Sequence, residues 1–404
     1  FRSNNFFIKN TSKFDNLSLK IFGKQKKIIK DKIQRVENGL PHAEIANNQI
    51  NFCFEEKANI LDQMDKYKVP GISIAVISNF EIEWAKSYGI KDVRNKEKVT
   101  LNTVFEAGSI SKSLTAAAVL HFIEKKILTL DENINNILKT WKLPENEFTK
   151  ESKVTLQHLL THTSGVNLPD SMFSYDDKFI PTIEQVLNGE PPALNDPVEV
   201  FFSPGTKHQY SNHGFIIIQK ILEDITGNEF PKIMKEIIFE PLKMNNSTFY
   251  YPSEEMKKTM ASPHDLNGEA KETGLHHTAL AQGGLLSTPT DLAKFMLELM
   301  KAYKEKSNRI LSSALVKKML TSIVTLNPAQ FFGLTGQGFG IFLIEKERTL
   351  NFINTGQNLP GMNSVIKGNP LNGHGVAIMS NGRRGDILNL EVNISIDKLY
   401  QGFF

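Results

Sequence analysis

The chain has 404 residues, of which 40% are hydrophobic and 23% are charged, and its formal net charge is +3. This composition is too apolar for a disordered chain, and no run reaches the roughly 18 consecutive apolar residues that a membrane span needs. The small charge argues against a dedicated nucleic-acid binder. A single cysteine, Cys53, excludes an internal disulfide and a zinc site built from cysteines. We therefore expect a soluble globular protein long enough for two or three domains.

Residues 1–50 form a basic extension with a net charge of +6, so the remaining 354 residues carry −3. The chain begins with Phe1 rather than methionine, which is compatible with a signal peptide removed upstream. A partial apolar stripe at helical spacing lies among the lysines: Ile28, Ile29, Ile33, Val36 and Leu40. One interpretation is a helix that makes weak contact with a membrane surface or docks a partner. We favour a helix that lies on the body of the protein with a solvated basic face, because the stripe is only partial.

Past residue 50 the patterns become regular. In chain order they predict a helix over Ile60–Tyr67, a strand over Gly71–Ile77, its hairpin partner over Glu81–Tyr88 and a helix over Ser109–Lys126. Helices are then predicted over Leu156–Leu160, Phe215–Thr226 and Asp291–Lys301, the last preceded by a capping segment from Ser287. Strands return at Phe339–Glu345, Thr349–Ile353, Met362–Ile366 and Gly375–Ser380, before a final helix over Leu388–Leu399.

Strands at both ends of the chain with helices between them predict an α+β fold. One antiparallel sheet would take strands from both ends, be flanked by N- and C-terminal helices, and hold an inserted, mostly helical domain. We divide the chain into the extension (residues 1–50), a discontinuous sheet domain (residues 51–105 and 302–404) and a helical domain (residues 106–301). The groove where the two domains meet is the expected ligand site.

A Ser-x-x-Lys pattern occurs at Ser109–Lys112, and also at Ser364–Lys367 and Ser395–Lys398. Only Ser109 opens a predicted helix with small apolar residues in its next turns. The dipole and free N–H groups of a helix start lie beside such a serine. A lysine one turn further on reaches the hydroxyl, and its pKa falls if it is buried, so that it can accept a proton. The alternative is that Ser109 is a plain helix cap and Lys112 a surface residue.

A second candidate is Tyr210-Ser-Asn212, the only Tyr-x-Asn in the chain, on a loop before the helix expected from Phe215. A phenol beside a lysine ammonium ionises more easily, so Tyr210 could return a proton to a leaving group. The Asn212 amide could hydrogen-bond both the lysine and a substrate carbonyl. The alternative is that Asn212 merely caps the helix.

Ser109-x-x-Lys112 followed by Tyr210-x-Asn212 resembles the serine β-lactamase and penicillin-binding-protein superfamily. The nearest branch is that of class C β-lactamases, D-aminopeptidases and related serine esterases. Further stretches carry the resemblance from about residue 55 to the end of the chain: Val69–Val76, Leu159–Gly165, Gln282–Asp291 and Asn354–Gly361. Several motifs in the same order make this a strong signal.

The resemblance implies a β-lactamase/transpeptidase-like fold and an acyl-transfer enzyme without metal or cofactor. Its substrate would be a small molecule or peptide with an ester or amide bond. Ser109 would be the nucleophile, with Lys112 and Tyr210 as its acid/base network and Asn212 positioning the substrate. The oxyanion hole would be the backbone N–H groups of Ser109 and Gln357. Relatives of this kind also favour a periplasmic or secreted location.

The sequence departs from the family at the third motif, which has Lys or His before Thr-Gly or Gly-Gly. The best match here is Asn354-Thr355-Gly356, and with Gln357 these residues are predicted to bind substrate. A neutral amide in place of a cation weakens the binding of carboxylates such as β-lactams. Arg383 or Arg384 could supply a replacement charge, although paired arginines are usually solvated.

Two functions stay open. The first is a serine hydrolase that forms an acyl-enzyme on Ser109, with a neutral ester or an unusual peptide favoured over a β-lactam. The second is a binding or scaffold protein that kept the fold and lost turnover, which Asn354 favours. His162 and His213 are candidates for a catalytic imidazole. However, His162 ends a predicted helix, where a backbone hydrogen bond is more typical.

Overall fold

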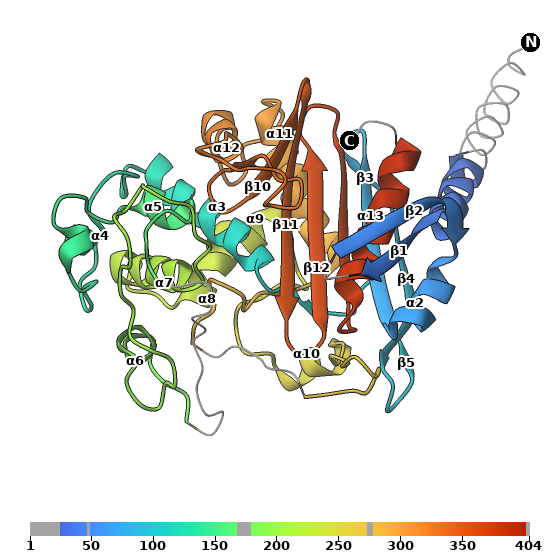
Figure 1. Ribbon diagram of the computed structural model, residues 1–404, viewed down its shortest axis with the longest axis horizontal. Coiled ribbons are helices and arrows are strands. Elements are labelled where there is room, and N and C mark those ends of the chain that lie inside the picture. The colour runs from blue at the N-terminus through green and yellow to red at the C-terminus, as the bar shows by residue number, and fades with distance from the viewer. Residues whose placement is uncertain (1–24, 47–48, 168–178, 273–277, 401–404) are drawn as a thin grey trace, which may run out of the picture.

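The computed structural model describes residues 25–46, 49–167, 179–272 and 278–400 (Figure 1). Its centre is a nine-stranded antiparallel sheet with the order β5-β4-β3-β13-β12-β11-β10-β9-β8. The strands of this sheet are β3 (Gly71–Ser78), β4 (Glu81–Asp92), β5 (Glu97–Lys98), β8 (Val324–Thr325), β9 (Gly336–Gln337), β10 (Phe342–Lys346), β11 (Thr349–Asn358), β12 (Met362–Asn369) and β13 (His374–Ser380). The expectation of one sheet built from both ends of the chain is confirmed.

The remaining elements surround this sheet. Two short pairs lie outside it: β1 (Leu40–Ala46) with β2 (Gln49–Ala58), and β6 (Phe105–Glu106) with β7 (Leu286–Ser287). The main helices are α2 (Ile60–Tyr67), α3 (Ile110–Glu124), α5 (Leu156–Leu160), α6 (Ile183–Asn188), α7 (His213–Thr226), α8 (Phe230–Met234), α11 (Pro289–Tyr303), α12 (Ser313–Met319) and α13 (Gly385–Tyr400). Shorter helical turns are α4 (Ile134–Ile137), α9 (Glu240–Leu242), α10 (Glu254–Thr259) and the turns at Glu147–Thr149 and Lys235–Phe239. None of the described helices has the length and apolarity that crossing a membrane takes.

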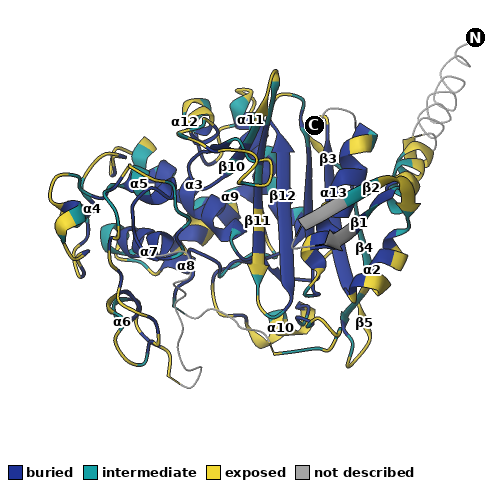
Figure 2. Cartoon of the chain, in the orientation of Figure 1, coloured by how far each residue is buried: buried dark blue, intermediate teal, exposed yellow. Residues whose placement is uncertain are grey.

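The two faces of strand β3 pack into two different hydrophobic cores. All eight of its residues are buried, and successive side chains point to opposite faces of a strand. Ala75 and Ile77 therefore join the core beneath α3 and α11, whereas Ile74 and Val76 join the core beneath α2 and α13. Figure 2 shows the central strands as buried along most of their length.

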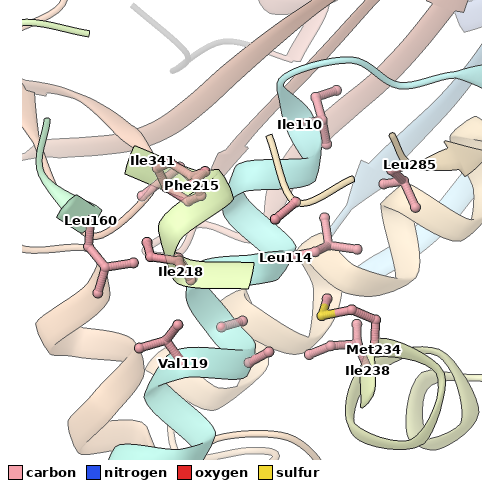
Figure 3. Packing of buried hydrophobic residues seen from close by; sticks show 14 of the residues in the cluster. Ile110, Leu114, Val119, Leu160, Phe215, Ile218, Met234, Ile238, Leu285 and Ile341 are labelled. Carbon is pink, nitrogen blue, oxygen red and sulfur yellow. The ribbon is translucent and has the colours of Figure 1, made fainter. Parts of the chain in front are cut away.

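Helix α3 is the centre of the larger core. Twelve of its residues are buried, and its apolar side chains lie on every face rather than in one stripe. Leu114 and Val119 on α3 lie among Phe215 and Ile218 of α7 and Met234 of α8 (Figure 3). This packing holds the start of α3 and the loop before α7 in a fixed relation, which positions the site.

The described part of residues 1–50 packs on the body. Residues 25–37 are helical, Val36 is buried, and Lys32 forms an ion pair of 2.6 Å with Glu83 of β4. Leu40, which we placed on the helical stripe, instead begins β1, so the stripe is shorter than predicted. Membrane contact through this segment stays a prediction, and residues 1–24 lie outside the described part.

Helix α11 falls on the helical side of the domain division that we drew from the sequence. In the structure it packs against β3, β12 and β13 and covers that face of the sheet. Thr288 caps it by accepting a hydrogen bond from the Asp291 N–H, as its capping segment predicts. Helix α11 thus belongs to the layer that covers the sheet, and the division into domains stays a prediction.

Candidate active site

The chain enters α3 through a tightly held turn. Strand β6 pairs with β7, and the Ala107 N–H donates to the Leu285 carbonyl at 2.8 Å. Gly108 follows with φ of +53°, a region that glycine occupies without strain. Ser111 Oγ then donates to the Gly108 carbonyl at 2.6 Å. These contacts fix Ser109 at the start of the helix.

The structure brings Ser109, Lys112 and Tyr210 together. Lys112 Nζ lies 3.0 Å from Ser109 Oγ, and the Tyr210 hydroxyl donates to the same oxygen at 2.8 Å. Ser109 occupies the N-cap position, but its side chain makes no capping hydrogen bond. The interpretation of Ser109 as a plain cap is therefore wrong, since its hydroxyl lies between an amine and a phenol.

Lys112 is a buried amine rather than a surface residue. It is 1% exposed, and its Nζ also lies 2.6 Å from the Gln282 carbonyl oxygen. The rings of Tyr210 and Phe215 flank the amine at 4.9 Å and 5.7 Å. Burial without a counter-ion lowers the pKa of Lys112 well below its ordinary value. The site therefore favours the neutral amine, which can accept a proton.

The pKa of Tyr210 differs from our expectation of a phenol that ionises easily. Burial raises the pKa of its phenol to about 12, although the hydrogen bond to Ser109 lowers it in part. With its pKa raised to about 12, Tyr210 keeps its proton at neutral pH. This protonation state gives one direction of hydrogen bonding: Tyr210 donates to Ser109, and Ser109 can donate to Lys112.

His162 supports Tyr210 without touching the serine. Its ring packs on the Tyr210 ring with centroids 4.3 Å apart, and its Nδ1 accepts the Ser211 N–H at 3.1 Å. Burial lowers the pKa of His162 well below its ordinary range. The expected backbone hydrogen bond is present. His213, at the start of α7, is also buried, and burial lowers its pKa to about 4.

Asn212 begins α7 but does not cap it. Its side chain makes no capping hydrogen bond, and among the described residues its buried Oδ1 has no partner. An unsatisfied buried amide oxygen costs about 1–3 kcal/mol. The interpretation of Asn212 as a mere cap is wrong.

Asn354 holds the sheet to α3. Its Nδ2 donates to Ser113 Oγ at 2.9 Å, and the Ser109 and Gly340 carbonyl oxygens each lie 3.4 Å away. Its Oδ1 accepts the Thr355 N–H at 3.0 Å, and the residue is only 5% exposed. The amide that replaces the family cation is thus saturated by contacts within the protein, whereas Thr355 is exposed.

Strand β11 continues past Asn354 and approaches the serine closely. A Cβ added to Gly356 would lie 1.9 Å from the Ala107 carbonyl oxygen, and one added to Gly108 would lie 2.7 Å from the Gln357 nitrogen. The two glycines therefore allow the backbone at Gln357 to lie against the turn that holds Ser109. No backbone carbonyl among the described residues accepts the Ser109 N–H.

The two arginines do not replace the missing cation. Arg383 lines a separate hollow of about 420 Å³ with Leu359, Pro360 and Asp265, and Arg384 is exposed. Within the described ranges no hydrogen bond or ion pair joins either guanidinium to Ser109, Lys112, Tyr210 or Asn354.

Glu106 is a buried carboxyl three residues before Ser109 that the sequence did not single out. It is 3% exposed and accepts a hydrogen bond of 2.8 Å from Asn358 Nδ2. Burial raises its pKa from 4.5 to about 7. A glutamate after a strand-like phenylalanine gives no sign of burial in the sequence, since β6 is too short to show a pattern.

This raised pKa predicts a pH-dependent stability. The folded state binds the Glu106 proton more tightly than the unfolded state, so the stabilisation is complete below pH 4.5 and is lost as pH rises through about 7. We expect Glu106→Gln to raise the free energy of unfolding on the order of 3 kcal/mol at pH 8, and far less at pH 5. Urea unfolding at both values measures this. An equal gain at the two values would contradict the assignment.

A buried Ser-x-x-Lys helix start, a Tyr-x-Asn loop and a facing sheet edge define the β-lactamase-like class. Comparison with known sequences places the chain more narrowly: the Beta-lactamase family profile matches residues 57–395. The chain belongs to this family.

Three relatives illustrate the similarity. The octameric penicillin-binding protein homologue from Pyrococcus abyssi superposes with a TM-score of 0.68 and 28% identity, over 84% of this chain and 78% of that one. Unguisins hydrolase ungD' from Aspergillus campestris is 27% identical over 48% of this chain and 36% of its own length. Teichoic acid D-alanine hydrolase from Staphylococcus aureus is 24% identical over 66% and 64%.

The matched segments span between about a third and two thirds of these curated relatives. The fold of this chain is that of penicillin-binding proteins and β-lactamases, as expected. Family and relatives together support a serine hydrolase in general terms.

Proposed function

We propose that this protein is a serine hydrolase that cleaves an ester or amide through an acyl-enzyme on Ser109. One observation carries the proposal: the Ser109 hydroxyl lies within hydrogen-bond distance of both Lys112 Nζ and the Tyr210 hydroxyl. A nucleophile held between a base and an acid matches the arrangement that activated serines need.

Acylation follows from the protonation states. The Ser109 oxygen bonds to the substrate carbonyl carbon while its proton passes to the neutral Lys112 amine. The N–H groups of Ser109 and Gln357 stabilise the negative oxygen that forms. Tyr210 then gives its proton to the leaving group as the carbonyl–leaving-group bond breaks, and the Lys112 ammonium returns the serine proton to the Tyr210 phenolate. Water then attacks the acyl carbon, and the same proton transfers run in reverse. The acid is released and the Ser109 hydroxyl is restored.

The residues around the serine support neutral substrates. Asn354 is bonded to Ser113 and supplies no charge for a substrate carboxylate. The hydrolase relatives named above act on teichoic acid D-alanine and on unguisins, as their names state. For this chain we propose a substrate of the same general kind: a small molecule or peptide with an ester or amide bond. We also extend to this chain the extracellular or envelope location that the teichoic-acid relative suggests.

Turnover tests the proposal. The wild type and Ser109→Ala would be incubated with p-nitrophenyl acetate and butyrate and with a chromogenic cephalosporin. We expect the wild type to release p-nitrophenol and Ser109→Ala to match the buffer rate. If the wild type turns over none of the three, and a serine-directed phosphonate adds no mass, the scaffold function that the neutral Asn354 favours takes its place.

The neutral side chain of Asn354 leads to a prediction about the rate of acylation by β-lactams. In Asn354→Lys the Ser113 hydroxyl and the Ser109 and Gly340 carbonyls would accept an ammonium. We expect acylation by the cephalosporin to accelerate about tenfold, because the ammonium adds a positive charge that attracts the substrate carboxylate where Asn354 has none. Stopped-flow acylation rates measure this, with Asn354→Met as the neutral control. Equal rates for all three proteins would contradict the charge argument.

A further inference from the structure

An exposed aromatic side chain lies on the loop between β8 and β9. Phe332 is 100% exposed, and its neighbour Phe331 is half-buried. Phe332 also has φ of +53°, a left-handed conformation that a bulky side chain rarely adopts. A residue that is both strained and exposed adds nothing to folding, and such residues gather at functional sites.

The loop that carries Phe332 is held by hydrogen bonds. At its ends the Leu326 N–H donates to the Thr335 carbonyl and the Thr335 N–H to the Leu343 carbonyl, each at 2.9 Å. Inside it the Phe331 N–H donates to the Asn327 carbonyl at 3.0 Å. The exposure of Phe332 is therefore imposed by an ordered backbone.

A series of rings joins this loop to the serine. The Tyr210 ring, whose hydroxyl bonds Ser109, stacks on Phe342 of β10 with centroids 6.4 Å apart and an interplanar angle of 16°. The His208 ring lies 6.5 Å from Phe342 and 5.5 Å from Phe331. The rings of Tyr210, Phe342, His208 and Phe331 thus form a continuous aromatic series, and Phe332 follows Phe331 on the loop.

The described rings that make up this surface carry no charge. Burial lowers the pKa of His208, so that its imidazole is neutral at physiological pH. Asn354, on the neighbouring strand, is also neutral and bonded to Ser113. The chemistry of the surface fits an apolar group, which gains from leaving water in contact with aromatic faces.

We propose that Phe331, Phe332 and Phe342 form an aromatic wall that binds an apolar acyl chain or aryl group of the substrate beside Ser109. This rests on the proposed function and narrows it: the preferred substrates are esters or amides with extended apolar acyl groups. Phe331 and Phe332 determine specificity without touching the reacting atoms.

The first test measures selectivity in turnover. The ratio of kcat/KM for p-nitrophenyl hexanoate to that for the acetate is compared in the wild type, in Phe332→Gly and in Phe331→Ala/Phe332→Ala. Phe54→Ala, which removes a phenylalanine 53% exposed on β2, is the matched control. We expect the ratio to fall at least about tenfold in the double variant while the acetate rate stays within about threefold. An unchanged ratio overturns the wall.

A second test needs no turnover. Ser109→Ala, alone and combined with the two phenylalanine substitutions, is titrated calorimetrically with N-phenylhexanamide and N-phenylacetamide. We expect the hexanamide to bind at least about tenfold tighter, and the combined variant to lose this preference. Binding preference without turnover in the wild type overturns the proposed function alone. Turnover without binding preference overturns the wall alone.

A third arm separates apolar from cationic ligands, since aromatic faces also attract ammonium groups. The wild type and the double variant are compared on a D-alanyl p-nitrophenyl ester. We expect the two phenylalanine substitutions to change this rate less than about threefold. A selective loss of the D-alanyl ester with the hexanoate ratio intact overturns the apolar assignment. Phe332→Gly should also melt no lower than the wild type, because glycine relieves the strained φ of +53°.

Discussion

Lys112→Met is expected to lower kcat by about 10³-fold while the protein stays folded. The side chain is 1% exposed and flanked by two rings, so methionine keeps its volume and apolar contacts. What methionine removes is the neutral amine 3.0 Å from the serine oxygen. General-base catalysis contributes about 10²–10⁴-fold in enzymes. Ester turnover and thermal unfolding measure the two effects separately.

Lys112→Arg distinguishes a base from a mere charge. Arginine keeps a cation but cannot lose its proton in a protein, so we expect it to be as inactive as methionine. For the wild type, the rate should fall as pH decreases through the depressed pKa of Lys112, because protonation removes the base. An arginine variant with activity within tenfold of the wild type would mean that Lys112 acts by charge alone.

Gly108→Ala is expected to lower kcat/KM by about 10²-fold. The added Cβ would lie 2.7 Å from the Gln357 nitrogen, so the backbone there must move away from Ser109. Loss of one oxyanion donor costs about 10²–10³-fold. The positive φ of +53° adds a stability cost of about 1 kcal/mol.

Gly227→Ala is the matched control for this substitution. Gly227 ends α7 with φ of +67°, and a Cβ there would meet nothing within 4 Å. It should show the same backbone cost in urea unfolding with unchanged kcat/KM. If both variants lose activity alike, the close approach at Gln357 is not what the reaction depends on.

The regular elements could be predicted from the sequence because local patterns define them. The bounds of α2 and α5 agree at both ends, since Pro70 and the Thr155 cap leave little choice. Strand β10 begins at Phe342 rather than Phe339, because Gly340 with φ of +64° interrupts the strand pattern.

Polar segments at the ends of strands could not be predicted from such local patterns. Strand β11 extends to Asn358, five residues past the predicted end, through residues of low strand propensity that pair with β12. The β1–β2 hairpin was not predicted, although Ile50, Phe52 and Phe54 alternate along β2 as strand residues do. Tertiary pairing decides such segments.

At the site, the sequence indicated the residues but not their states. Ser109 and Tyr210 lie 101 positions apart, and only the family resemblance joined them before the structure did. The lowered pKa of Lys112 follows from its burial against the rings of Tyr210 and Phe215, which no local pattern encodes. The saturated contacts of Asn354 are equally tertiary.

The most direct measurement is peptide mapping after reaction of the native protein with a serine-directed fluorophosphonate. A reactive oxygen beside a neutral amine should take up one equivalent of the reagent, on the tryptic peptide that contains Ser109, and Lys112→Met should take up none in the same time. An adduct on another serine, or an unmodified wild type, would contradict the account.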